Sequence, residues 1–238
     1  MFYLFDGTKS GFLTAFLEAF SDDDAYLCSR ASQLPMVELK EVKTDEIRAQ
    51  KAAERLSTFD TGFSYELDRL LRAGELDSEQ IAFRYFKRLA LIKRSIRNRL
   101  AIPDVFAAQQ RIKKVNLEIH RMHGFIRFME SENGLLYAPF SPDNDICDLL
   151  VPHFRTRLGE YAFVLHDVKR KKAAFCDGET FFLSPLEQAD IFLSANESEW
   201  QALFKRYYQA VNIPERERLN QMRGYMPKRY WKFLPELK

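Results

Sequence analysis

The segment "HRMHGFIRFMESENGLLYAPF" (residues 120–140) marks the point where the hydrophobic pattern changes period. Up to Gly124 the apolar residues recur every three or four positions, as on one face of a helix, whereas "FIRFME" and "LLYAPF" have the shorter period of strands. Ser-Glu-Asn-Gly, which separates these two runs, is typical of a turn, so the segment predicts a β-hairpin. We therefore expect an α+β protein in which a basic helical segment precedes a sheet.

Downstream of this hairpin, the pattern predicts a helix, a second hairpin and another helix. "SPDNDICDLLVPHFRTRLG" (141–159) is expected to be helical, with Ser141 as its cap and Pro142 at its first position. Residues 161–178 predict the second hairpin, "TFFL" a further short strand, and "NESEWQALFKRYYQAV" (196–211) an amphipathic helix. This order predicts an antiparallel sheet built from hairpin, helix, hairpin and helix, covered by helices on one side.

The part of the chain before Gly124 is expected to be mostly helical. "FYLFDG" (2–7) predicts a strand and a turn, followed by a helix capped by Ser10. The longest helix is predicted from Ser78 to about Leu100, and a second basic helix is expected to begin at Pro103. With 21 phenylalanines in 238 residues, the core should be rich in aromatic rings.

Charge is distributed unevenly along the chain. Residues 1–80 contain 9 Lys/Arg and 16 Asp/Glu, whereas residues 84–127 contain 12 Lys/Arg and only two acids, Asp104 and Glu118. We expect an acidic strand–helix region over 1–77 and basic helices plus an α+β domain over 78–238, packed as one compact unit. Arginines without local acidic partners suit a polyanion such as DNA. In the rival interpretation, the acidic N-terminal part folds back and neutralises them.

Several classes of protein are disfavoured by what the sequence lacks. No apolar run approaches the ~20 residues that span a bilayer, and the N-terminus does not resemble a signal peptide. Three widely separated cysteines and the lack of a Gly-rich phosphate loop argue against a disulfide framework, an iron–sulfur or zinc cluster, and the usual ATP or dinucleotide enzymes. We expect a soluble cytoplasmic protein with no metal or cofactor of its own and no membrane partner.

The four histidines allow more than one interpretation. His120 and His123 have the spacing of two ligands on one helix face, but the pattern is weak, and both also suit the C-terminal end of a helix. His153, His166 and Asp167 are candidates for acid–base catalysis. His166 and Asp167 are adjacent in a predicted strand and should face opposite sides of the sheet, so they are not expected to form a relay with each other.

Five ordered blocks resemble a family of uncharacterised bacterial proteins described as DNA-metabolism or DNA-repair factors. The blocks are "HRMHGFIRF", "LYAPFSPDNDI", "LLVPHFRTRLG", "VLHDVKR" and "MPKRYWKFLPEL". The resemblance runs in order from the opening "FYLFDGTKSGFLTAF" and covers nearly the whole chain. His123 departs from it, since lysine is more frequent there. Members are typically encoded beside a radical S-adenosylmethionine protein or fused to a uracil-DNA glycosylase domain.

This resemblance implies DNA as a ligand and a separate radical S-adenosylmethionine enzyme as a partner, with a uracil-DNA glycosylase as a further candidate partner. Any iron–sulfur cluster and S-adenosylmethionine would then belong to the partner. The residues of this chain that match the family pattern are His120, Met122, Gly124, Arg127, Phe128, Tyr137, Pro139, His153, Phe154, His166, Asp167, Pro227, Lys228, Tyr230, Trp231 and Pro235.

The first hypothesis is a DNA-binding accessory protein for repair or base modification. The residues expected to bind nucleic acid are Arg84, Arg88, Arg94, Arg97, Lys113, Lys114, His120, Arg121, Arg127, Lys228, Arg229, Tyr230 and Trp231. His120, Arg121 and Arg127 are expected to converge on one anionic ligand. In the tail, the aromatic residues either stack on bases or fasten the C-terminus to the core. The alternatives are an enzyme acting on a nucleotide or DNA end through His153, His166 and Asp167, and a module that binds an acidic protein.

Overall fold

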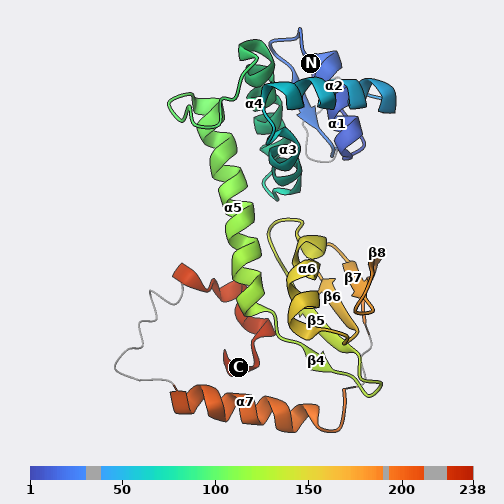
Figure 1. Ribbon diagram of the computed structural model, residues 1–238, viewed down its shortest axis with the longest axis vertical. Helices are drawn as coiled ribbons and strands as arrows, with labels where there is room; N and C mark the ends of the chain where they lie inside the picture. The colour runs from blue at the N-terminus through green and yellow to red at the C-terminus, as the bar shows by residue number, and fades with distance from the viewer. Residues whose placement is uncertain (31–38, 190–192, 212–223, 238) are drawn as a thin grey trace. The chain divides into compact units, whose positions relative to one another are not determined.

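The computed structural model describes residues 1–30, 39–189, 193–211 and 224–237 (Figure 1). The chain divides into two compact units, Met1–Asn116 and Leu117–Lys238. The division falls within helix α5 (Pro103–Phe125), so it is not the charge boundary near residue 77. The mixture of helices and strands confirms the α+β class.

The first unit combines a small parallel sheet with helices. Its elements are β1 (Phe2–Leu4), α1 (Lys9–Ala19), β2 (Tyr26–Cys28), β3 (Leu39–Glu41), α2 (Glu46–Phe59), α3 (Phe63–Arg72), α4 (Ser78–Ile92) and the first part of α5. The strand order is β2-β1-β3, and β1 is parallel to both neighbours. Thr8 caps α1 by accepting a hydrogen bond from the Gly11 amide at 2.9 Å, so the prediction of Ser10 as the cap is wrong by two residues.

Aromatic rings fill the core of this unit, as the phenylalanine content predicts. Phe12 and Phe63 both meet Phe86 edge to face, with ring centroids 6.5 and 4.9 Å apart. Phe16 meets Phe83 in the same way at 5.9 Å. All five side chains are buried, and this geometry is favourable for aromatic pairs.

Helix α4 is shorter than its hydrophobic period predicts. It ends at Ile92, and Lys93 adopts a left-handed conformation with φ of 55°. Beyond it, Ile96 is fully buried and the Ser95 hydroxyl donates to Asp60 at 2.5 Å. These tertiary contacts outweigh local helix propensity. Arg94 and Arg97 therefore do not lie on α4, and the prediction of one continuous basic face from Arg84 to Arg97 is wrong.

The second unit is built around a five-stranded mixed sheet. Its elements after α5 are β4 (Met129–Glu130), β5 (Leu136–Phe140), α6 (Cys147–Leu158), β6 (Phe163–Asp167), β7 (Lys172–Cys176), β8 (Phe181–Pro185), α7 (Glu197–Val211) and the 3₁₀ helices η3 (Lys228–Phe233) and η4 (Pro235–Leu237). The strands lie in the order β4-β5-β6-β7-β8. Helix α6 packs against β6 and β7, and α7 packs against η4 (Figure 1).

The prediction of an entirely antiparallel sheet is wrong. β4–β5, β6–β7 and β7–β8 are antiparallel, but β5 and β6 are parallel, with Leu136 opposite Phe163 and Phe140 opposite Asp167. The connection between these two strands contains α6, and a crossover through a helix returns the chain in the same direction. The sheet of the first unit is parallel as well.

The start of α6 also differs from its prediction. The helix begins at Cys147 rather than at Pro142, although it continues through Pro152 as far as Leu158. The backbone amides of Asp143 and Asn144 donate to the Glu118 carboxylate at 2.8 and 2.9 Å. Because these amides are bound to a buried side chain of α5, this part of the chain is held outside the helix.

Candidate nucleic-acid interface

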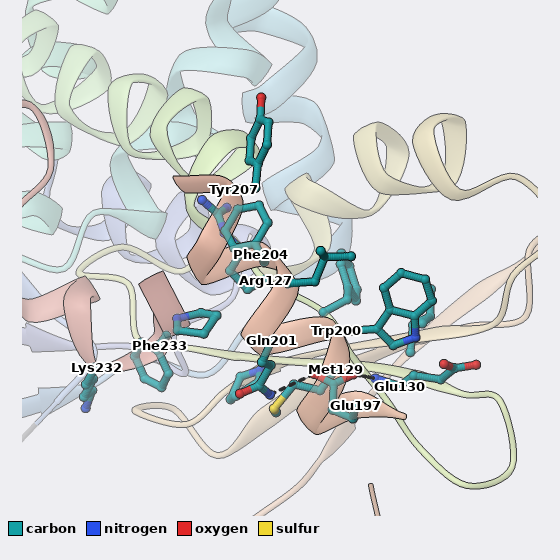
Figure 2. A pocket seen from close by; sticks show the side chains of 15 residues that line it. Arg127, Met129, Glu130, Glu197, Trp200, Gln201, Phe204, Tyr207, Lys232 and Phe233 are labelled. Carbon is teal, nitrogen blue, oxygen red and sulfur yellow. Dashed lines mark hydrogen bonds between the residues drawn. The ribbon is translucent and has the colours of Figure 1, made fainter. Parts of the chain in front are cut away.

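The second unit contains a pocket of about 760 Å³, bounded by the β4–β5 hairpin, α7 and the C-terminal 3₁₀ helices (Figure 2). It is lined by Arg127, Phe128, Met129, Glu130, Leu136, Pro139, Glu197, Trp200, Gln201, Leu203, Phe204, Tyr207, Lys232, Phe233 and Pro235. Most of these side chains are apolar or aromatic, and a few carry charge. This composition and volume are typical of sites for small organic ligands.

Helix α7 supplies a row of aromatic rings to this pocket. Trp200, Phe204 and Tyr207 are separated by four and three residues, so they share one face of the helix. Trp200 is 58% exposed, Phe204 37% and Tyr207 60%. In Figure 2, Phe233 and Lys232 lie on the opposite side of the pocket from Trp200 and Glu130. Such open ring faces are available for stacking by a planar ligand.

One carboxylate organises the polar part of the pocket. The Glu197 side chain is buried, accepts a hydrogen bond from the backbone amide of Glu130 at 2.9 Å, and accepts another from Gln201 Nε2 at 2.8 Å. The first bond links the start of α7 to β4, and the second fixes the side-chain amide of Gln201 (Figure 2). Glu197 therefore holds the helix that carries the aromatic row.

Arg127 borders the pocket, but its guanidinium group is already bound. Nε and Nη2 donate to Glu236 at 3.1 and 2.6 Å, and Nη1 donates to the carbonyls of Gly124 and Ile126. The guanidinium also lies 5.5 Å from the ring centroid of Phe204. Because the Glu236 carboxylate is buried, the primary role of Arg127 is to neutralise it. The Arg127 side chain also forms part of the pocket wall.

Tyr230 fastens the C-terminal segment to the rest of the second unit. Its ring is buried, and its hydroxyl donates to Glu118 at 2.5 Å and accepts from Arg229 at 2.7 Å. Burial and the adjacent Glu118 carboxylate raise the pKa of the Tyr230 phenol. Arg229 pairs with Asp143 at 2.5 Å, and the Trp231 indole donates to the Met226 carbonyl. Of the two roles considered for the tail aromatics, these contacts favour anchoring.

Two cations of the first unit that were expected to bind phosphates have acidic partners. Arg88 pairs with Asp104 at 2.8 Å, and Arg97 pairs with Asp60 and Glu66, also at 2.8 Å. Both acids beside Arg97 are buried, so displacing the guanidinium would leave two carboxylates without their counter-charge. These arginines lack acidic partners close by in the sequence, but the fold supplies them from positions 16 to 37 residues away.

The other predicted phosphate ligands of the first unit differ among themselves. Lys114 pairs with Glu75 at 2.7 Å, across a largely exposed surface. Arg84, Arg94 and Lys113 are exposed, and among the described residues none of the three has an ion pair. The acidic N-terminal region therefore neutralises part of the basic surface, as the rival interpretation predicts, and leaves these three cations accessible.

Of the three residues expected to converge on one anion, the two arginines are bound to different groups. Arg121 Nη2 donates to the Gly224 carbonyl at 3.1 Å, whereas Arg127 is bound to Glu236. His120 is exposed. The convergence of these three on one ligand therefore gains no support from their contacts.

His123 and His153 are stacked face to face. Their ring centroids are 4.0 Å apart with an interplanar angle of 13°, and both Nε2 atoms are buried without a hydrogen-bond partner among the described residues. Burial, with smaller contributions from His153 and His120, lowers the pKa of His123. Nearly parallel rings do not direct their in-plane lone pairs at one metal ion. Among the described residues, no group of three or more His, Cys, Asp or Glu side chains is placed to bind a metal.

His166 and Asp167 have structural hydrogen bonds. His166 Nδ1 is 2.6 Å from the Tyr137 hydroxyl and Nε2 is 2.9 Å from the Leu186 carbonyl, so both ring nitrogens have partners. Burial lowers the pKa of His166. Asp167, which is fully buried, pairs with Arg170 at 3.0 Å and accepts from the backbone amides that begin the β6–β7 turn. In the described part of the chain, no hydrogen bond or ring contact joins either residue to His153.

The cysteines offer no accessible nucleophile. Cys28, Cys147 and Cys176 are free and buried. Burial raises the pKa of the Cys147 thiol to about 12, which keeps it protonated near neutral pH.

A family model links this structure to a known domain. The model of a domain of unknown function, DUF4130, matches residues 76–236, which is more than half of the chain. The chain belongs to the DUF4130 family. The match includes the pocket, the stacked histidines and all of α4 to η3. Neither a curated protein nor a solved structure matches the chain. No helix among the described residues is long and apolar enough to cross a membrane.

Sequence reasoning singled out Arg127, which borders the pocket, but missed the aromatic row of α7. The amphipathic helix over 196–211 was predicted, but Trp200, Phe204 and Tyr207 were not singled out as a site. Their spacing of four and three residues was a usable signal, because it places three rings on one face. That they face a pocket rather than a core follows only from the tertiary structure.

Proposed function

We propose that this DUF4130 protein is a nucleic-acid-binding accessory protein whose pocket in the second unit takes the bases of single-stranded DNA. The observation that carries this function is the row of exposed rings on α7 in a pocket of about 760 Å³. Base–aromatic stacking contributes roughly 1–3 kcal/mol per base. Three rings on one helix face are enough to dominate the affinity for one or two bases.

Single strands fit this pocket better than duplexes. In a duplex the faces of each base are covered by its neighbours, so stacking on protein rings first requires unstacking, at a cost of a few kcal/mol. An unpaired strand already exposes its bases. Lys232 lines the pocket and Lys228 is exposed on the same 3₁₀ helix, so both are available to phosphates next to a bound base.

The proposed partner is a separate radical S-adenosylmethionine enzyme, and a uracil-DNA glycosylase is a further candidate. This part of the proposal is supported by the sequence resemblance alone. It assigns the chemical step, the iron–sulfur cluster and S-adenosylmethionine to the partner, and DNA binding to this chain. The structural hydrogen bonds of His166 and Asp167 do not favour the alternative of a nucleotide-processing enzyme.

The direct test is fluorescence anisotropy with a labelled single strand and the matching duplex over a range of salt concentrations. We expect tighter binding of the single strand and a fall in affinity with salt. A Trp200→Ala/Phe204→Ala variant should bind the single strand at least about tenfold more weakly. Phe182→Ala is the control, because Phe182 is a ring on β8 that is more exposed than either Trp200 or Phe204 and lies outside the pocket lining. Unchanged affinity in the double variant would contradict the proposed function.

A further inference from the structure

Within the pocket, the side chain of Gln201 is held in one orientation. Its Nε2 donates to Glu197 at 2.8 Å, and Glu197 is in turn fixed by the backbone amide of Glu130 at 2.9 Å. A primary amide that points its nitrogen at a carboxylate directs its carbonyl oxygen away from it. Gln201 lines the pocket, so its Oε1 is a positioned hydrogen-bond acceptor (Figure 2).

Glu197 is also fixed in the pocket, but both of its carboxylate oxygens already accept hydrogen bonds, from the Glu130 amide and from Gln201. The donor side chains of the pocket are not positioned in the way that Gln201 is. Trp200 and Tyr207 are more than half exposed, and within the described part of the chain no hydrogen bond holds the Trp200 N–H or the Tyr207 O–H in one direction. Every nitrogen of the Arg127 guanidinium already donates to Glu236 or to a backbone carbonyl. The Lys232 ammonium lies over the ring of Phe233 on an exposed side chain, which suits a phosphate more than a base edge.

A positioned acceptor discriminates between bases by their edges. Cytosine and adenine present an exocyclic amino group that donates hydrogen bonds, whereas thymine and uracil present a carbonyl oxygen at the corresponding position. An amino group can donate to Gln201 Oε1. A carbonyl at the same place would bring two acceptors together and leave both without the hydrogen bonds that they make in water.

We infer that Gln201 is a specificity-determining residue, and that the pocket prefers an unpaired base with an exocyclic amino group over uracil or thymine. This inference rests on the proposed function, since it concerns the base bound by the same pocket. One hydrogen bond gained or lost at a buried edge corresponds to a preference of about 3- to 10-fold.

The closest matched probes are single strands of deoxycytidine and deoxyuridine, which differ in the amino or carbonyl group at position 4 of each base and in the hydrogen that uracil carries on N3. Competition between the two strands for the wild-type protein at one salt concentration should favour deoxycytidine. Gln201→Met, which keeps the length of the side chain and removes the amide, should bring the two affinities together while retaining most of the binding to deoxyuridine.

Each outcome separates this inference from the proposed function. Equal affinities in the wild-type protein, or tighter binding of deoxyuridine, would overturn the role of Gln201 and leave single-strand binding intact. A deoxycytidine preference that survives in Gln201→Met would also overturn it. If neither strand binds, the proposed function fails and this inference fails with it. The wild-type comparison decides the question even if the variant does not fold.

Discussion

The two units place their aromatic rings differently, although both pair arginines with acids. In the first unit, rings are packed edge to face inside the core, and Arg97 is bound between Asp60 and Glu66. In the second, the rings of α7 are exposed beside a pocket. The comparison teaches that a basic sequence alone does not predict a free cationic surface, because Arg88 and Arg97 find acidic partners within their own unit.

The largest effect should come from breaking the closed network of the first unit. In Arg97→Ala, Asp60 and Glu66 lose their counter-charge while buried, so we expect the free energy of unfolding to fall by about 2–4 kcal/mol. Chemical denaturation measures this change. Arg94→Ala is the control, since Arg94 is exposed and should change stability by less than about 0.5 kcal/mol. Equal effects of the two variants would show that Arg97 is not a structural residue.

A smaller loss is expected at the tail of the second unit. Tyr230→Phe removes the hydroxyl that donates to Glu118 and accepts from Arg229, which should cost about 1–2 kcal/mol. Limited proteolysis should then cleave the C-terminal segment sooner than in the wild-type protein. Trp200→Phe provides the comparison, because it alters an exposed ring of the pocket and should leave the rate of cleavage unchanged.

The free energy of unfolding should also depend on pH, because burial lowers the pKa of two histidines of the second unit. The folded-state pKa of His123 is lowered by burial, so the unfolded chain binds a proton more readily. Stability should therefore be fully present above about pH 6.5 and should fall as the pH drops through the folded-state pKa. The lowered pKa of His166 acts in the same direction.

His123→Phe should weaken this dependence, because it removes one of the two groups and keeps a ring against His153. Denaturation curves at pH 7.5 and pH 5, taken on the wild-type and variant proteins, measure the change. If the two proteins lose the same stability between these pH values, His123 does not contribute.

Much of the fold follows from local sequence patterns. The change of period at Gly124 correctly predicts the β4–β5 hairpin after α5, and the aromatic content correctly predicts the core of the first unit. The end of α4 was missed, because a helical period does not show that Ile96 is buried or that Ser95 hydrogen-bonds to Asp60. The parallel β5–β6 pair was missed since strand direction depends on how the α6 crossover packs.

The site was less predictable than the fold. Ion pairs such as Arg97–Glu66 join residues 31 positions apart, so counting charges in a local window could not find them. His166 and Asp167 are residue types that can act as acids or bases, and only their hydrogen bonds and ion pair show that they hold the sheet and its turn together. The spacing of Trp200, Phe204 and Tyr207 could be read from the sequence, but the exposure of their rings could not.

The most direct test of the central claim is ultraviolet crosslinking of a bound single strand to the full-length protein, followed by mass spectrometry of the crosslinked peptides. We predict crosslinks concentrated in α7, at Trp200, Phe204 and Tyr207, and at Phe233 on η3. Crosslinks confined to the basic segments over 84–114, with none on α7, would contradict this account and assign DNA binding to the first unit.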